Sequence, residues 1–102
     1  MLLRDLAHAR TGDKGDISNI VVVASRLDNY ARLASLLTTD RVRRRLGLGD
    51  GQRIDRYELP ALGAMNFVIH GLLAGGVTRS VALDAHGKCL GAWLLGLEID
   101  ED

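Results

Sequence analysis

The polar segment at residues 10–19 most constrains how this chain folds, because it separates two apolar segments. It reads Arg-Thr-Gly-Asp-Lys-Gly-Asp-Ile-Ser-Asn, and most of its residues are charged, amide-bearing or glycine. Residues 2–10 and 17–25 on either side read as strands, and the β-branched run Ile20–Val23 indicates a strand covered on both faces. We therefore predict two strands joined by a dense polar loop, a place where functional residues are often found.

Helices are predicted after the second strand. The apolar spacing over residues 30–37 follows i, i+3, i+4, i+7 and predicts a helix that Asp28 or Asn29 caps. A short second helical piece is expected from residue 39 or 40, and Gly47 is expected to end it. The arginines within residues 41–45 could grip phosphates, but such a run is more typical of a solvated helix face.

The middle of the chain is interpreted as a strand followed by a helix. Residues 52–59 are expected to form the strand, with Tyr57 and Leu59 facing inward and Pro60 ending it. Residues 63–73 are expected to form the helix, since apolar residues recur there at helical spacing.

A hairpin is predicted for the last quarter. Residues 77–84 and 89–99 are expected to be its strands, joined by a turn at 84–88 in which glycine can adopt positive φ. The second strand is apolar on both faces, and Trp93 in its middle is expected to be substantially buried. The apolar face left uncovered predicts a homodimer.

The expected order is therefore β-β-α-β-α-β-β in a single domain over residues 1–102. Two helices cannot cover both faces of a sheet of this size, so we predict an α+β, two-layer α/β sandwich with both helices on one face of a mainly antiparallel sheet.

Composition excludes several classes of protein. Lysine plus arginine equals aspartate plus glutamate, 13 each, so the neutral chain has no electrostatic signature of nucleic-acid or anionic-membrane binding. The single cysteine, Cys89, cannot form an intramolecular disulfide or hold a zinc ribbon or iron–sulfur cluster. We expect no metal or other cofactor. No membrane span or signal peptide is recognisable, so a cytoplasmic location is expected.

The polar loop is the candidate site. Its glycine amides and Lys14 suit a phosphate or carboxylate, but Asp13 and Asp16 offset the positive charge, and the spacing is not that of a P-loop. A tight turn whose side chains bond its own backbone explains the loop equally well. His8 could act as a base with Asp13 or Asp16, although a structural histidine is the more common case.

Asn66 and Arg79 are the best companions for the loop, and Gly75 and Gly76 could bring backbone close to a ligand. Alternatively, the two glycines end a helix and Arg79 pairs with a loop aspartate. We expect one polar patch, whose candidate ligand-binding residues are Arg10, Gly12, Asp13, Lys14, Gly15, Asp16, Asn19, Asn66, Gly75, Gly76 and Arg79. The weak catalytic candidates are His8, Asp13 and Lys14.

Five ordered segments resemble the AtuA-like domain of the acyclic terpene utilisation proteins. They are Arg10–Asp16 with Asn19, Arg56–Pro60, Met65–Phe67, Gly75–Ser80, and Asp84–Lys88. Thr11 stands where this family usually has serine, and Met65 where it usually has leucine. Cys89 stands where a small hydroxyl residue is common, which argues against a required cysteine nucleophile.

The resemblance covers essentially the whole chain and implies a ferredoxin-like fold. It also implies a context in acyclic terpene and acyl-CoA catabolism, without established catalytic residues. We therefore expect an accessory subunit or ligand-binding module that joins a larger partner, with a small carboxylate or acyl-CoA as a possible ligand. The alternative is a small enzyme acting on an acyl-thioester or carboxylate, with acid–base residues in the loop.

Overall fold

The computed structural model describes residues 1–14, 17–71 and 90–99, of which Asp13 and Lys14 are described by their backbone alone. The elements, in chain order and with η for a 3-10 helix, are η1 (Leu3–Asp5), β1 (Ala7–Lys14), β2 (Ile17–Ala24), η2 (Leu27–Asn29), α1 (Tyr30–Leu36), α2 (Thr39–Leu46), β3 (Ile54–Leu59), η3 (Pro60–Leu62), β4 (Ala64–His70) and α4 (Leu90–Leu95).

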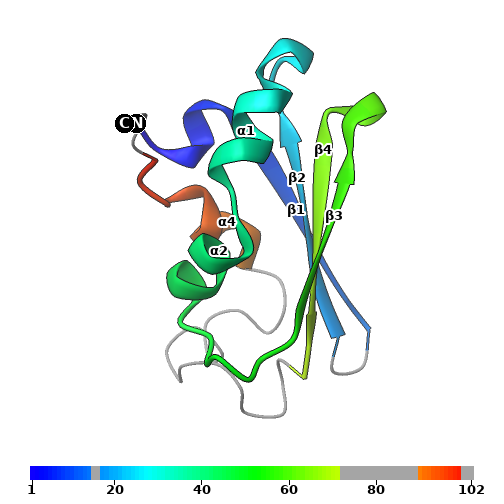
Figure 1. The fold of residues 1–102 in the computed structure, drawn as a ribbon, viewed down its shortest axis with the longest axis vertical. Coiled ribbons are helices and arrows are strands. Elements are labelled where there is room, and N and C mark those ends of the chain that lie inside the picture. Colours follow the sequence, from blue (N-terminus) through cyan, green and yellow to red (C-terminus); the bar gives the residue numbers. More distant parts are fainter. Residues whose placement is uncertain (15–16, 72–89, 100–102) are drawn as a thin grey trace.

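The four strands form one antiparallel sheet in the order β1-β2-β4-β3. The helices α1, α2 and α4 all lie on one side of this sheet (Figure 1). The predicted fold class, a two-layer α+β sandwich of the ferredoxin-like kind, is therefore confirmed. The predicted order of elements is not, because it places a helix where β4 lies and a strand where α4 lies.

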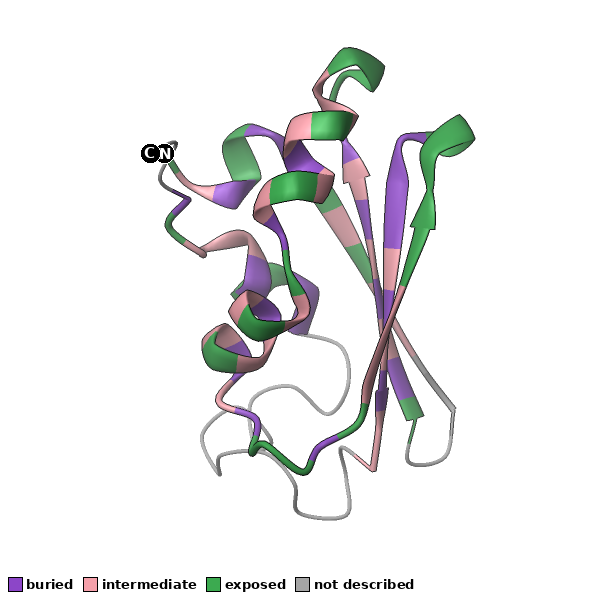
Figure 2. Cartoon of the chain, in the orientation of Figure 1, coloured by how far each residue is buried: buried purple, intermediate pink, exposed green. Residues whose placement is uncertain are grey.

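The core lies between the sheet and the helices (Figure 2). Inward side chains of β2 and β4 alternate with outward ones, as a sheet covered on one face requires. The fully buried side chains that meet there are Ile20, Val22, Met65, Phe67 and Ile69 from the sheet and Leu33, Val42, Leu46, Leu90 and Leu94 from the helices.

The predicted polar loop at residues 10–19 is largely strand. β1 and β2 pair without interruption from Ala7↔Ala24 to Lys14↔Ile17, so only residues 15 and 16 lie between the two strands. The expectation of a long loop was wrong because polarity alone does not exclude a strand. A sheet with one uncovered face accepts polar side chains at every second position.

The predicted helix at residues 63–73 is also wrong, because residues 64–70 form the central strand β4. The apolar residues there fit a helical stripe and a strand alternation alike. Met65, Phe67 and Ile69 are fully buried, and they alternate with half-buried Asn66 and Val68. Pairing with β2 and β3 on both sides decides in favour of the strand.

The predicted strand at residues 89–99 is instead the helix α4 over residues 90–95. Leu90 and Leu94, spaced i and i+4, are fully buried, whereas Trp93 is 45% exposed. The expected burial of Trp93 is therefore wrong, and so is the argument for a homodimer from an apolar strand. The hairpin strand at 77–84 and the turn at 84–88 lie outside the described residues.

Tyr57 and Leu59 were expected to face inward and do not. In the β3–β4 register Tyr57 lies beside Asn66, on the side away from the helices, and it is 51% exposed. Arg56 takes the inward position and donates to the carbonyl oxygens of Ala34 at 2.6 Å and Leu37 at 3.2 Å. These carbonyls at the end of α1 need a donor, which a long arginine at the sheet edge supplies.

The predictions for α1 and α2 are confirmed except for one cap. α2 begins at Thr39, and Gly47 ends it with φ 71° in the left-handed region. The Thr38 hydroxyl caps α2 by accepting from the Arg41 amide at 3.2 Å. Asn29 makes no side-chain capping bond to α1, and Asp28 accepts from Arg26 instead.

The two ends of residues 1–99 are joined by backbone bonds. The Leu3 amide donates to the Leu97 carbonyl at 2.8 Å, and the Ile99 amide donates to the Met1 carbonyl at 2.7 Å. These bonds place the segment after α4 beside η1 at the edge of the helical layer (Figure 1).

Candidate functional site

The sheet face turned away from α1, α2 and α4 holds the candidate site, and we call it the open sheet face. Successive strand residues point to opposite sides, so the register identifies its members. They are His8, Arg10 and Gly12 of β1, Ile17, Asn19, Val21 and Val23 of β2, Asn66, Val68 and His70 of β4, and Asp55, Tyr57 and Leu59 of β3.

Polar and apolar side chains of the open sheet face form rows across the strands. One row runs Arg10, Val21, Asn66, Tyr57, with one residue from each strand. The next row runs Gly12, Asn19, Val68, Asp55. The first row brings polar groups from three strands beside Val21, and the second places Asn19 and Asp55 on either side of Val68.

Asn19 and Asn66 link the two rows. The Nδ2 of Asn19 donates to the Oδ1 of Asn66 at 3.3 Å. Gly12 lies opposite Asn19, and a Cβ on residue 12 would lie 2.7 Å from the Asn19 Oδ1. The group that approaches Gly12 closely is therefore the Asn19 amide. The glycine provides space for that amide, and Gly12 is not among the glycines with positive φ.

His70 and Asp55 form the second polar pair of the open sheet face. The Nε2 of His70 lies 2.9 Å from the Oδ2 of Asp55, and Arg53 lies 3.2 Å from the same carboxylate. Hydrogen bonds from Arg53, and then from His70, hold the pKa of Asp55 below its usual value of 3.8. Asp55 is thus a carboxylate at neutral pH and orients the His70 ring.

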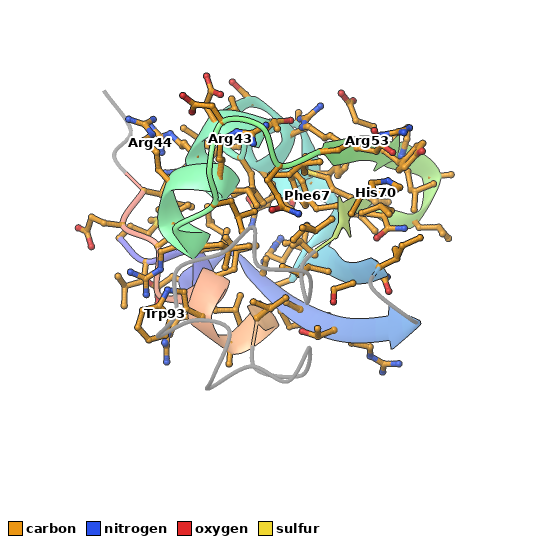
Figure 3. The ribbon with its side chains drawn as sticks, turned by 90° about the horizontal axis from the view of Figure 1, so that it is seen from below. Arg43, Arg44, Arg53, Phe67, His70 and Trp93 are labelled. Carbon is orange, nitrogen blue, oxygen red and sulfur yellow. The ribbon has the colours of Figure 1, made fainter. Side chains whose placement is uncertain are left out.

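The backbone around His70 is fixed from the β3 side. The His70 amide donates to the Arg53 carbonyl at 3.0 Å, and the Gln52 side-chain amide donates to the His70 carbonyl. Gln52 is buried, so its amide has little freedom to move. His70 therefore sits at a rigid position at one end of the open sheet face, beside Arg53 (Figure 3).

The structure brings part of the predicted site together. Arg10, Gly12, Asn19 and Asn66 share the open sheet face, as the expected single patch requires. The remaining predicted residues are not placed: Gly15, Asp16, Gly75, Gly76 and Arg79 lie outside the described residues, as do the side chains of Asp13 and Lys14. Whether these residues bind a ligand stays a prediction.

His8 is exposed on the edge strand β1, opposite Val23. His70 is the better-positioned histidine, since a described carboxylate orients it. The predicted helix over residues 63–73 would have separated His70 from Asp55, and the predicted site included none of His70, Asp55 and Tyr57. The signal was present in the alternation of Asp55 and Tyr57 along β3, which puts both on one face.

Thr11 has a structural role on the other side of β1. Its Oγ1 accepts a hydrogen bond from the Gly91 amide at 2.8 Å. The first amides of a helix lack intrahelical partners, so Thr11 acts as a cap for α4 supplied from a strand. A Cβ on Gly91 would lie 2.7 Å from the Thr11 Oγ1, and this glycine therefore allows α4 to approach β1.

Two further observations apply to residues 1–14, 17–71 and 90–99 of the chain. Within these residues no cluster of three or more histidine, cysteine or acidic side chains could bind a metal ion. None of the helices described there has the length and apolar character that a bilayer crossing requires.

Comparison with known proteins gives one match. The model of a family described as the AtuA ferredoxin-like domain matches residues 1–100, nearly the whole chain. No curated protein and no solved structure shows significant similarity to the chain.

Proposed function

We propose that this chain, which belongs to the AtuA ferredoxin-like domain family, is an accessory subunit that docks onto a larger protein through its open sheet face. Family membership suggests an association with acyclic terpene utilisation. The partner would be an enzyme of acyclic terpene or acyl-CoA breakdown. The observation that carries the proposal is a sheet face that α1, α2 and α4 leave uncovered.

Apolar side chains on this face supply the drive for docking. Tyr57 is 51% exposed, and Leu59 and Ile17 are each 38% exposed. Val68 lies between Tyr57 and Ile17 in the sheet, and Val21 lies in the row of Tyr57. Apolar groups gathered on one face of a small protein commonly mark an interaction surface. Aromatic residues such as Tyr57 are enriched where such surfaces bind most strongly.

Polar groups on the same face would give the interface its specificity. Asn19 is hydrogen-bonded to Asn66, and His70 is hydrogen-bonded to Asp55. Each of these side chains therefore keeps a hydrogen-bond partner when an interface removes its water. Arg10 is exposed in the same row as Asn66. Its fork-shaped guanidinium suits a carboxylate, either of the partner or of a small carboxylate or acyl-CoA ligand held between the two proteins.

Site-specific photocrosslinking tests the proposal in cells that grow on an acyclic terpene. A photoreactive phenylalanine analogue at Tyr57 should yield an adduct with an enzyme of terpene or acyl-CoA breakdown, and the same group at Arg26 should not. Arg26 is exposed and directly precedes η2, outside the strands that form the open sheet face. Val68→Asp should abolish the adduct, because it introduces a charge at the centre of the face. An equal adduct from both positions would contradict the proposal.

Acid–base catalysis is a second candidate function, which the His70–Asp55 distance of 2.9 Å favours. A carboxylate that orients a histidine is the usual arrangement around a general base. The loop residues first considered for this role would then be secondary. Turnover of an acyl-CoA by the isolated chain, lost in His70→Asn, would favour an enzyme over an accessory subunit.

The predicted homodimer and cytoplasmic location also stay predictions. A dimer would now be expected to use the open sheet face, since the two copies could bury Val21 and Val68 against each other. Light scattering at micromolar concentration checks this: a mass of 11.1 kDa indicates a monomer, and Val68→Asp should reduce a dimer to that mass.

A further inference from the structure

Three arginines of α2 converge on one face of that helix. Arg41, Arg44 and Arg45 are spaced i, i+3 and i+4, and side chains at this spacing are neighbours on a helix surface. Arg43 lies outside this group and donates instead to the carbonyl oxygens of Gly49 and Gln52, at 2.8 and 2.6 Å. We call the first three the arginine face. It lies across the molecule from Arg53 and His70 (Figure 3).

The arginine face lines a cavity of about 340 Å³, together with Leu97 and Glu98. Cavities of this size are at the lower end of those that hold small molecules. The wall opposite α2 comes from the segment after α4, so the cavity is formed by tertiary packing.

Arg45 is held in a fixed position at this cavity. Its Nε donates to the Trp93 carbonyl at 2.9 Å, and the Trp93 Nε1 donates back to the Arg45 carbonyl at 3.0 Å. The guanidinium carbon lies 4.9 Å from the centre of the Trp93 ring, within cation–π distance. A Cβ on Gly96 would clash with the Arg45 Nη2, so the glycine provides space for the guanidinium.

Among residues 1–14, 17–71 and 90–99, the positive charge of this face is only partly compensated. Glu98 is the acidic residue of these ranges that lines the cavity, and its carboxylate lies 3.4 Å from the N-terminal ammonium of Met1. Arg44 donates weakly to the Asp40 carbonyl oxygen at 3.4 Å, which leaves its charge in place. Within the described part of the chain, Arg41 and Arg44 form no ion pair.

An arginine run near a helix C-terminus is favourable without any ligand, because cations there interact well with the helix dipole. That explanation accounts for Arg44 and Arg45, which lie in the last turn of α2, but not for Arg41 near its start. It does not account for their convergence on a cavity, for the reciprocal bonds of Arg45 and Trp93, or for the space left at Gly96.

We propose that the arginine face binds a small ligand that carries two linked phosphoryl groups. Each guanidinium can form paired hydrogen bonds with phosphate oxygens, and three of them exceed what a single carboxylate can engage. A diphosphate offers several acceptor oxygens on two adjacent phosphorus atoms, which matches the three guanidinium groups that line this cavity. The site lies apart from the open sheet face and does not depend on the function proposed for that face.

Titration with inorganic pyrophosphate, followed by calorimetry and by tryptophan fluorescence, tests this site. Trp93 is the only tryptophan of the chain, so its emission reports directly on events at Arg45. Arg41→Gln and Arg44→Gln should each weaken binding roughly tenfold, as expected for loss of a charge-assisted bond. Arg26→Gln removes the same charge beside η2 and should leave the affinity unchanged.

Gly96→Ala separates geometry from charge, because it preserves every charge and displaces the Arg45 guanidinium. Gly96→Ala should weaken pyrophosphate binding. Its thermal unfolding temperature, compared with that of the wild type, shows whether the variant is still folded. Monophosphate should bind more weakly than pyrophosphate at equal ionic strength. The proposal is overturned if the wild-type chain does not bind pyrophosphate at low salt, or if Arg26→Gln weakens binding as much as Arg44→Gln does.

Discussion

The side-chain oxygen of Asn19 occupies the space beside Gly12, 2.7 Å from where a Cβ on residue 12 would lie. The missing side chain at Gly12 on β1 therefore leaves the space in which Asn19 on β2 bonds Asn66 on β4.

Gly12→Ala should displace the Asn19 amide and lower the free energy of unfolding by about 1 kcal/mol, the usual net value of a hydrogen bond. Denaturant unfolding measures this. Gly49→Ala is the matched control, since a Cβ there meets nothing within 4 Å. Equal stability of the two variants would show that Asn19 adjusts without loss.

Thr11→Val should also destabilise the fold by about 1 kcal/mol, because it removes the hydroxyl that caps α4 while keeping the side-chain shape. Thr11→Ser keeps the acceptor for the Gly91 amide and should remain close to the wild type. Thermal or denaturant unfolding of the three chains compares them. A serine variant as unstable as the valine variant would show that the methyl group, and not the hydroxyl, matters.

Leu94→Ala should cost about 2–5 kcal/mol, since Leu94 is fully buried in α4. Trp93→Ala should cost less, although tryptophan is larger, because Trp93 is 45% exposed. The ranking of the two unfolding free energies checks the position of α4. The reverse ranking would be expected if residues 89–99 formed a strand with Trp93 inside.

Asp55 should make stability fall on acidification. Because Arg53 and His70 lower its pKa in the folded state, the stability it contributes is present above its usual value of 3.8 and is lost as the pH falls through the lower folded pKa. Asp55→Asn should therefore reduce the loss of stability between neutral pH and about pH 3. Urea unfolding across this range measures the loss.

Carboxyl NMR titration identifies the cause of that pKa shift. Arg53→Gln should raise the pKa of Asp55 toward its usual value more than His70→Asn does, since the Arg53 hydrogen bond is the larger cause. An unchanged Asp55 titration in Arg53→Gln would contradict this assignment.

Local signals predicted α1 and α2 well, whereas α4 was predicted to be a strand. α1, α2 and the left-handed Gly47 follow from residue spacing and backbone freedom, which act within a few positions. β4 was missed because Met65, Val68 and Ile69 satisfy the helical spacing as well as Met65, Phe67 and Ile69 satisfy the strand spacing. Pairing with β2 and β3 makes residues 64–70 a strand, and a local sequence pattern carries no information about that pairing.

The same difference applies to the site. Arg10, Gly12, Asn19 and Asn66 were predicted to lie together, and they share the open sheet face. The Asp55–His70 pair was missed because it exists only through the β3–β4 register, which requires β4 to be a strand. Trp93 and Arg45 were likewise treated separately, since 48 positions divide them.

The position of α4 has a consequence for how the protein is made. The four described strands precede it in the chain, so their sheet can leave the ribosome while Leu90 and Leu94 are still inside the exit tunnel. Until then β1 and β2 lack the helix that packs against them. The nascent protein therefore passes through a stage in which the sheet has formed but the helical layer lacks α4. The backbone hydrogen bond from Ile99 to Met1 can form only after synthesis has passed residue 99.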